Sequence, residues 1–381
     1  MRILLVSDEL EDQSMGGPRV LTRLQAELRA LGQDCDLWFR AQIGGRPRSQ
    51  RLRWAVSPWL TRQAVRRCAA DYDVMDASSA QGCRLPRGAV LVARSHGLEH
   101  RYYGELLADA RAGLLHKPWT HRLWYPPTCL RQVELALRRA RRIIVPNAGD
   151  RDFIVSRRWA PAESVEVIPH GVEAAEWRGA PAATATRGGG LLFCGWWTTS
   201  KGVAYLAAAY AQLLAAGDAP PLTLLGVARP GAGWAEEERR IRQQFPAAAQ
   251  SRLRLLPRTL DQAAVTAAYR AHDLLVCPST SEGFGLVVLE ALSQRLPVVC
   301  TAVAGVAHWL RHGHDAWLVA SRDAAALAAA ITTLWQNAEM RRALAEAGYQ
   351  TAAALSWAAV ARQTLACYQR AREEQSREAA A

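Results

Sequence analysis

The chain has 381 residues, half of them apolar, and a formal charge of +12 that comes almost entirely from arginine, because Lys117 and Lys201 are the only lysines. This length suits two domains better than one, and no apolar run is long enough to span a membrane. Eight scattered cysteines without a Cys-x-x-Cys pair argue against a zinc ribbon or a disulfide framework and for a reducing cytosol. The N-terminus turns acidic too soon for a signal peptide, so we expect a cytoplasmic protein.

The first half of the chain predicts alternating strands and helices. Short apolar strands are expected at residues 2–7, 35–39, 73–76, 89–93, 142–145 and 165–168, with helices at 19–31, 130–140 and 150–158. This alternation is typical of a parallel sheet covered by helices on both faces. Asp-x-Asp strings at 34–36 and 71–73 match a metal-binding pattern, but they fall at the start of predicted strands, and we interpret them as turn residues.

Two basic clusters stand out in this half. Residues 40–67 hold eight arginines and no acidic residue, with Trp54 and Trp59 among them, and residues 138–142 hold four more arginines. Three interpretations remain open: a solvated face, a membrane-surface patch and a nucleic-acid site. Arginine beside interfacial tryptophan is the composition that adheres to anionic lipid. Nucleic acid is the weakest of the three, because no zinc finger, RNA-binding signature or basic zipper accompanies the charge, and we expect no such partner.

After residue 173 the pattern stops and then restarts. Residues 174–189 are rich in Ala, Pro, Thr and Gly, which predicts a linker. Strands follow at 191–194, 222–225, 253–256, 273–277, 298–300 and 317–319 with helices between them, one at 203–216, and a long amphipathic helix closes the chain. We therefore expect an α/β protein with two Rossmann-like doubly wound domains that face each other across a cleft. The predicted parts are 1–173, the linker 174–189, 190–351, and a C-terminal helix at 352–381 that packs back toward the N-terminal domain.

The most informative segment is the stretch from Pro278 to Ala291, which reads Pro-Ser-Thr-Ser-Glu-Gly-Phe-Gly-Leu-Val-Val-Leu-Glu-Ala. It follows a predicted strand and opens a helix, whose first amide groups can hold an anion. Glu282 and Glu290 would lie about 12 Å apart if the whole stretch were helical, which is close to the span of a nucleoside diphosphate-sugar. The alternative is that Glu282 is only a first-turn charge and that Glu290 faces water.

Five motifs in this order make the chain resemble the retaining glycosyltransferases of family 4, which have the two-Rossmann-domain GT-B fold. They are Gly16-Gly17, Ser95-His96-Gly97-Leu98-Glu99, Ile168-Pro169-His170-Gly171-Val172, Lys201-Gly202 and the segment 278–291. The resemblance implies that a sugar passes from a nucleotide-sugar to an acceptor hydroxyl with retained anomeric configuration. It implies no cofactor, and no metal is required, because a lysine and a helix N-terminus can stabilise the leaving group.

The resemblance also assigns roles to individual residues. Three residues are catalytic: Glu282 binds hydroxyls of the transferred sugar, His96 lies against that sugar, and Lys201 neutralises the leaving diphosphate. The predicted donor-binding residues are Gly16, Gly17, Arg258, Phe284, Gly285, Leu286 and Glu290. Arg19 and Arg101 are predicted on the acceptor side. The plainer alternatives are that the glycine pair is an ordinary turn and that the histidine is structural.

Three positions depart from the family pattern. Gly195-Trp196 stands where the family usually has Gly-Arg, so one cation that holds the diphosphate is missing. Either Arg258 or an arginine from the first domain compensates, or the leaving group is stabilised differently. Arg295 replaces a small residue and His308 an acidic one, and we expect both changes near the nucleotide.

The acceptor is set by the first domain. Tyr102, Tyr103 and residues 117–127 either line an acceptor groove or pack a loop against the core. If residues 40–67 touch lipid, the acceptor is a lipid-linked saccharide or a lipopolysaccharide precursor, and the enzyme is peripheral on the cytoplasmic face of the membrane. We therefore favour a role in synthesis of cell-envelope polysaccharide, lipopolysaccharide or glycolipid.

Other functions fit the same fold. A nucleotide-sugar epimerase shares the architecture. A phosphorylase does too, but it would need a late lysine for pyridoxal phosphate, and none follows Lys201. A non-catalytic, arginine-rich binding protein with a degenerate transferase fold is the third alternative, and Trp196 is its best support.

Overall fold

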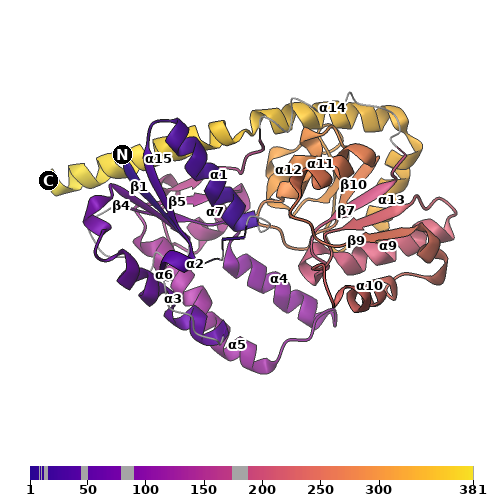
Figure 1. Ribbon diagram of the computed structural model, residues 1–381, viewed down its shortest axis with the longest axis horizontal. Helices are drawn as coiled ribbons and strands as arrows, with labels where there is room; N and C mark the ends of the chain where they lie inside the picture. Colours follow the sequence, from indigo (N-terminus) through magenta and orange to yellow (C-terminus); the bar gives the residue numbers. More distant parts are fainter. Residues whose placement is uncertain are drawn as a thin grey trace. The chain divides into compact units, whose positions relative to one another are not determined.

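The computed structural model describes residues 1–7, 9, 11–12, 16–43, 50–78, 90–173 and 188–380, apart from the side chains of residues 50, 51 and 53–55. The chain divides into two compact units (Figure 1). Unit 1 contains residues 1–103, 116–170 and 357–381, and unit 2 contains residues 104–115 and 171–356. The predicted linker at 174–189 lies outside the described residues except for Gly188 and Gly189.

Unit 1 is built on a six-stranded parallel sheet with the order β2-β1-β3-β4-β5-β6. Its strands are β1 (Arg2–Val6), β2 (Asp34–Trp38), β3 (Val74–Ser78), β4 (Val90–Arg94), β5 (Arg142–Val145) and β6 (Val165–Val167). Its helices are α1 (Gly16–Ala30), α2 (Arg40–Ile43), α3 (Gln50–Val65), α4 (Glu99–Arg111), α5 (Trp119–Tyr125), a π-helical turn η3 (Pro126–Leu130), α6 (Arg131–Arg139), α7 (Ala148–Ser156) and α15 (Trp357–Ala380). The second half of α4, from residue 104, is grouped with unit 2.

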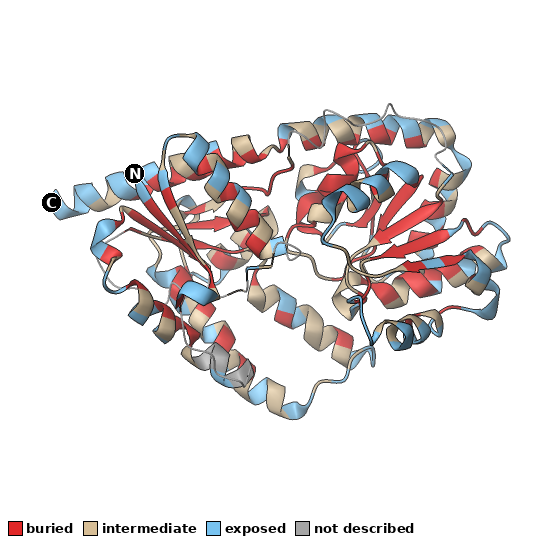
Figure 2. Ribbon diagram, in the orientation of Figure 1, coloured by how far each residue is buried: buried red, intermediate tan, exposed pale blue. Residues whose placement is uncertain are grey.

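Successive residues of these strands face opposite sides of the sheet, so each strand buries side chains under two helical layers. Leu4 and Val6 of β1 pack with Val65 at the end of α3, and β4 and β5 meet α6 and α7 in a second cluster. On the opposite face, Asp76 of β3 meets Tyr368 of α15, which packs along α1. Figure 2 shows the strands as buried and the outer helix faces as exposed.

Unit 2 repeats this plan with the strand order β12-β11-β10-β7-β8-β9, again all parallel. Its strands are β7 (Leu191–Cys194), β8 (Leu222–Leu225), β9 (Leu253–Leu256), β10 (Leu274–Cys277), β11 (Val298–Thr301) and β12 (Trp317–Val319). Its helices are α9 (Val203–Ala215), α10 (Trp234–Arg242), α11 (Gln262–Ala271), α12 (Leu286–Ser293), α13 (Ala324–Gln336) and α14 (Ala338–Ala354).

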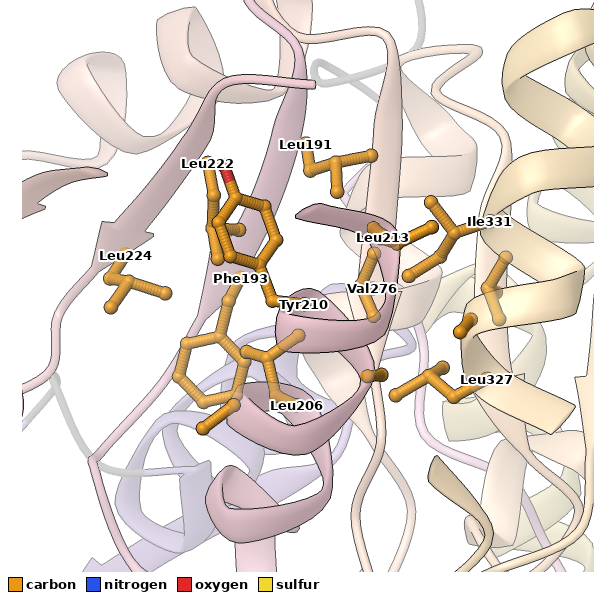
Figure 3. Close-up of a cluster of buried hydrophobic side chains, with 14 of the residues drawn as sticks. Leu191, Phe193, Leu206, Tyr210, Leu213, Leu222, Leu224, Val276, Leu327 and Ile331 are labelled. Carbon is orange, nitrogen blue, oxygen red and sulfur yellow. The ribbon is translucent and has the colours of Figure 1, made fainter. Parts of the chain in front are cut away.

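The core of unit 2 has one apolar cluster on each side of the sheet. Leu191 and Phe193 of β7 pack under α9, α10 and α13, whereas Leu192 between them joins the cluster under α11 and α12. Figure 3 shows the first cluster, in which Tyr210 of α9 and Ile331 of α13 lie over the strand residues. The apolar runs of these strands are therefore continuous because both faces are covered.

These observations confirm the predicted α/β fold with two doubly wound sheets. All twelve predicted strands are present, with ends within two residues of the predicted ones. The seven cysteines among the described residues form no disulfide, and Cys83 lies outside that part of the chain. Among the described residues, no helix has the length and apolar character needed to cross a membrane.

The strand order reverses once in each sheet, and open parallel sheets bind ligands at the carboxyl ends of the strands at that point. In unit 2 the reversal lies between β7 and β10, and in unit 1 it lies between β1 and β3. The loop after β3, residues 79–89, lies outside the described residues. The loops after β7 and β10 are described in full, and they carry four of the predicted site residues, namely Lys201, Glu282, Phe284 and Gly285.

Candidate functional site

Lys201 and Glu282 meet at the carboxyl ends of β7 and β10. Lys201 ends a short 3-10 turn after β7, Glu282 lies in the loop after β10, and the ammonium pairs with the carboxylate Oε2. Ser279 Oγ donates to the same oxygen at 3.3 Å. Two of the three residues predicted as catalytic are therefore in direct contact, and both are largely buried.

The charge of this pair is maintained by its surroundings. Burial has the largest single effect and lowers the pKa of Lys201, but the charge and hydrogen bond of Glu282, together with Cys277 and Cys194, raise it by more in sum, so the net pKa lies above the ordinary value for lysine. The lysine is therefore an ammonium at neutral pH. Its contact with the β10 loop depends on Gly202, which has φ +70° and where a Cβ would lie 1.8 Å from the carbonyl oxygen of Pro278.

The loop from Glu282 to α12 is fixed by backbone hydrogen bonds to the loop after β11. The amide of Gly305 donates to the Glu282 carbonyl at 3.1 Å, and the amide of Val306 donates to the Phe284 carbonyl at 2.7 Å. Gly285 takes the left-handed conformation at φ +100° and caps α12. The Phe284 ring is buried in the core, so only its backbone is available to a ligand. The first amides of α12 thus stand beside the Lys201–Glu282 pair.

Glu290 of α12 faces the interior of unit 2 rather than solvent. Its side chain is buried, and Tyr269 Oη of α11 donates to Glu290 Oε2 at 2.9 Å. The same hydroxyl lies 3.7 Å from Cys194 Sγ at the end of β7. The interpretation that Glu290 faces water is wrong, because α12 packs both its faces into unit 2. Sequence analysis missed Tyr269, whose position in a short helix carries no local signal.

Trp196 follows β7 and lies close to two arginines, one in the loop after β8 and one in the loop after β9. The loops after β7, β8 and β9 continue to pair beyond the strands, through the amide of Trp197 to Val227 at 3.0 Å and the amide of Arg258 to Ala228 at 2.8 Å. The Arg258 guanidinium stands 4.7 Å from the centre of the Trp196 ring, and that of Arg229 stands 6.0 Å away. Two cations therefore flank the position where the family pattern loses one, and Arg229 is the one that sequence analysis missed.

Arg295 and His308 have different surroundings. Arg295 follows the C-terminal end of α12, donates to Glu346 at 2.7 Å and stacks 3.6 Å from the centre of the Tyr349 ring. Its head group is therefore held on α14, at the opposite end of α12 from Glu282. His308 is exposed on the 3-10 turn (Gly305–Trp309) that holds the Glu282 loop.

In unit 1, His96 follows β4 and points into a polar cluster. Its ring centre lies 5.4 Å from that of His170, which in turn lies 6.2 Å from the Trp357 ring. Both ring nitrogens of His96 are buried without a hydrogen-bond partner among the described residues. Burial, together with the charge of Arg94, lowers the pKa of His96 to about 3. The imidazole is therefore neutral near pH 7, with one donor and one acceptor available to a bound hydroxyl.

A buried charge network lies beside His96. Arg94 of β4 pairs with Asp76 of β3 at 2.7 Å, and both side chains are almost completely shielded from solvent. Tyr368 of α15 donates to the same carboxylate. Sequence analysis missed this network, because its members are separated by up to 292 residues in the chain.

The glycine pair lies in the first turn of α1, not in the loop before it. A Cβ on Gly17 would lie 2.2 Å from Glu9 Oε2, so a carboxylate already approaches the backbone there. An incoming diphosphate would have to displace Glu9. Arg19 follows in the same turn and is half-buried.

The residues predicted near the acceptor are held by neighbours in unit 1. Arg101 pairs with the buried carboxylate of Asp150 at 2.8 Å. The rings of Tyr103 and Tyr125 stack at 5.1 Å, and His121 stacks on Tyr125 at 4.7 Å. These aromatic side chains pack α5 against α4, which matches the second of the two alternatives for this segment.

Both halves of the chain match known protein families. A family model described as Glycosyltransferase Family 4 matches residues 16–176, and one described as Glycosyl transferases group 1 matches residues 188–337. A D-inositol 3-phosphate glycosyltransferase from Frankia alni is 30% identical over 296 residues, which cover 74% of this chain and 71% of that protein. The chain belongs to glycosyltransferase family 4. In this glycosyltransferase, the group 1 match covers the part of the chain that holds Lys201, Glu282 and Glu290.

Solved structures give the fold of this family 4 glycosyltransferase. The sucrose-phosphate synthase of Thermosynechococcus elongatus superposes with a TM-score of 0.78 at 21% identity, covering 97% of this chain and 98% of that one. HepE of Anabaena, solved in complex with UDP-glucose, gives 0.68 at 17% identity over 95% of this chain and 98% of that one. The predicted GT-B fold is confirmed.

Proposed function

We propose that this glycosyltransferase binds a nucleotide-sugar at the carboxyl ends of β7 and β10 and transfers the sugar with retention of its anomeric configuration. The observation that carries the proposal is the contact of Lys201 with Glu282 beside the N-terminus of α12. A buried ammonium and a row of helix amides favour a diphosphate, and a carboxylate next to them favours sugar hydroxyls. A wholly structural ion pair would not need to stand at the strand ends where ligands bind.

Each residue then has a separate task. Lys201 and the amides of residues 284–286 stabilise the charge that develops on the leaving diphosphate. Glu282 orients the sugar, and Glu290, held by Tyr269, accepts hydrogen bonds from the ribose hydroxyls. Arg258 adds a cation next to Trp196.

The reaction exchanges one bond at the anomeric carbon for another. The bond from that carbon to the diphosphate oxygen breaks, and the acceptor oxygen forms a bond on the same face. The departing phosphate oxygen takes the acceptor proton, so no further base is required. His96 keeps its predicted role as a hydrogen-bonding group for the donor sugar, and its two ring nitrogens, which have no partner in the described part of the chain, support that role.

The donor and acceptor classes are also part of the proposal. UDP-glucose, which HepE binds in its solved structure, is the first donor to test. For the acceptor we propose a hydroxyl of a cell-envelope saccharide or glycolipid, with the enzyme acting on the cytoplasmic side and without a metal ion. Gly16, Gly17, Arg19 and Arg101 remain predictions for the donor and acceptor sides.

The test measures UDP release and product configuration in the presence of EDTA. A panel of UDP-sugars is offered with saccharide and polyol acceptors, and the anomeric proton of the product is identified by NMR. Lys201→Met is expected to lower turnover by about 10²–10³-fold, as loss of one transition-state donor does. Arg239→Met, which removes an exposed cation on α10, serves as the matched control. An inverted product, or full activity of Lys201→Met, would refute the proposal.

A further inference from the structure

The positive charge of this chain is concentrated in two segments that lack acidic residues. Residues 37–70 hold eight basic residues and no Asp or Glu, and residues 110–133 hold four basic residues and no Asp or Glu. Together these twelve equal the net charge of +12, so the rest of the chain is balanced. Both segments are mainly in unit 1, and they include α3 and α5.

The same two helices carry large apolar side chains that point to solvent. Leu52 and Trp59 of α3 are 53% and 51% exposed, and Trp119 and Leu123 of α5 are 71% and 64% exposed. Leu52 and Trp59 are seven positions apart and Trp119 and Leu123 four, so each pair lies on one helix face. Four of the eight exposed large apolar side chains in the described part of the chain are thus on α3 and α5.

These two helices are neighbours. α5 continues directly into the π-helical turn η3, and α3 contacts η3. Figure 1 shows α3 and α5 next to each other, and Figure 2 shows exposed residues along α5. The inner side of α5 is fixed by Tyr125, which is buried and stacked on Tyr103. The outer side of α5, with Trp119 and Leu123, faces solvent.

Four basic side chains near these apolar residues have no ion pair within the part of the chain that the structure describes. Arg62 and Arg66 extend the exposed face of α3, and Lys117 and Arg122 flank Trp119, and within the described residues no salt bridge joins any of the four to a carboxylate. The second basic cluster is different, because Arg141 and Arg142 pair with Glu378 and Glu374 of α15. Arg141 and Arg142 are therefore engaged within unit 1, whereas Arg62, Arg66, Lys117 and Arg122 are available to a partner.

We propose that the exposed faces of α3 and α5 form a docking surface for an anionic lipid bilayer. Tryptophan and leucine enter the interface between head groups and acyl chains, and arginine and lysine bind the phosphates. A nucleic acid would use the same cations, but it offers nothing to Leu52 or Leu123, which favours lipid. This inference rests on the surface alone and extends the proposed function by bringing the enzyme to a membrane-borne acceptor.

The test measures sedimentation of the full-length protein with vesicles, without donor or acceptor. Vesicles of phosphatidylcholine are compared with an equal mixture of phosphatidylcholine and phosphatidylglycerol at 150 mM salt. We expect at least tenfold stronger partition to the anionic vesicles. Trp119→Ser/Leu123→Ser and, separately, Arg62→Gln/Arg66→Gln are each expected to weaken that partition at least tenfold.

Matched controls come from unit 2. Leu260→Ser removes the most exposed large apolar side chain, at 77%, and Arg239→Gln/Arg240→Gln removes two exposed cations on α10. Both should leave vesicle binding unchanged, and an unchanged melting temperature of the α3 and α5 variants excludes misfolding. The arginine pair tests the surface even if the apolar pair melts early.

Three results would overturn the proposal. They are equal partition to both vesicle types, equal losses in the controls, and retention on a DNA duplex that depends on Arg62 and Arg66 but not on Trp119 and Leu123. The last result would identify a nucleic-acid surface. Because vesicle binding does not use the donor site, Lys201→Met should not affect it, so failure here and failure of the proposed transferase activity are distinguishable.

Discussion

The ammonium of Lys201 is paired with the carboxylate of Glu282, 81 positions further along the chain. The contact joins the loops after two strands that are neighbours in the sheet but are separated in the chain by β8 and β9. A diphosphate that approaches Lys201 must share the ammonium with Glu282, and a sugar hydroxyl can then take up the carboxylate. Without a ligand, the two charges therefore neutralise each other. A ligand that carries both a diphosphate and sugar hydroxyls can bind to both side chains.

The Tyr269 hydroxyl is expected to be necessary for nucleotide affinity. Tyr269→Phe removes the donor to the buried carboxylate of Glu290, which should lower the free energy of unfolding by about 1–3 kcal/mol. Because the carboxylate is then less well oriented, nucleotide affinity should fall severalfold, as measured by calorimetric titration. Tyr210→Phe is the control, since its hydroxyl donates to the Pro220 carbonyl in the core away from the site. A comparable loss of affinity in that variant would contradict the assignment.

Arg258 is expected to supply the positive charge that is missing at Trp196, where the family usually has an arginine. Arg258→Met should weaken nucleotide-sugar binding about tenfold or more, as loss of a charged hydrogen bond does. Restoring a cation through Trp196→Arg in the Arg258→Met background should recover part of that affinity, because the two side chains are adjacent. Arg229→Met, whose guanidinium lies farther from the ring, should have the smaller effect. The explanation fails if the second substitution restores nothing.

Gly202 is expected to tolerate no side chain. Gly202→Ala places a Cβ at φ +70° and 1.8 Å from the Pro278 carbonyl oxygen, so the loop that carries Lys201 must move. Gly217 at the other end of α9 has φ +80° and open space around it. Gly217→Ala should cost about 1 kcal/mol from the backbone conformation alone, and Gly202→Ala clearly more. Denaturant unfolding of the two variants measures the difference in the free energy of unfolding. Equal losses in the two variants would contradict the prediction, because the clash at Gly202 would then add no cost.

The fold was largely predictable, because the strands of both sheets are apolar runs whose two faces are covered by helices. Leu191–Cys194 and Leu222–Leu225 have the bounds that their sequence predicts. The helix α3 was not predicted, because its many arginines and the internal Pro58 hide its periodicity.

The site was predictable where a motif is local. Glu282, Gly285 and Glu290 belong to one continuous segment, whereas Tyr269 reaches Glu290 only through the packing of α11 on α12. Asp76 and Arg94 lie in apolar strands as single charges, and only the register of β3 against β4 shows that they neutralise each other. Long-range pairs of this kind leave no pattern in one sequence.

The buried histidines predict a stability that decreases in acid. The pKa of His96 is lowered to about 3 and that of His170 well below 6.5, so between these values the unfolded chain binds protons that the folded chain does not. Stability is thus complete above about pH 6.5 and falls as the pH decreases, by up to about 1.4 kcal/mol per pH unit for each histidine. His100 and His272 act in the same direction.

Unfolding by denaturant at a series of pH values measures this slope. His96→Asn should make it shallower between pH 6.5 and 4, because one of the groups that must stay neutral is gone. His116→Asn, which changes an exposed histidine, should leave the slope unchanged. A wild-type protein that is equally stable at pH 4.5 and pH 7 would contradict the burial of these rings.

The central claim, that a nucleotide-sugar binds between Lys201 and Glu290, is tested most directly by melting temperature. The purified protein is heated with a panel of nucleoside diphosphates and their sugar derivatives in EDTA, beside Glu290→Ala. We predict a rise with one nucleotide family, equivalent to about 2.7 kcal/mol at a hundredfold excess over the dissociation constant, and its loss in the variant. The absence of a rise with every member of the panel would contradict the claim and would favour a protein that has kept the transferase fold without its donor site.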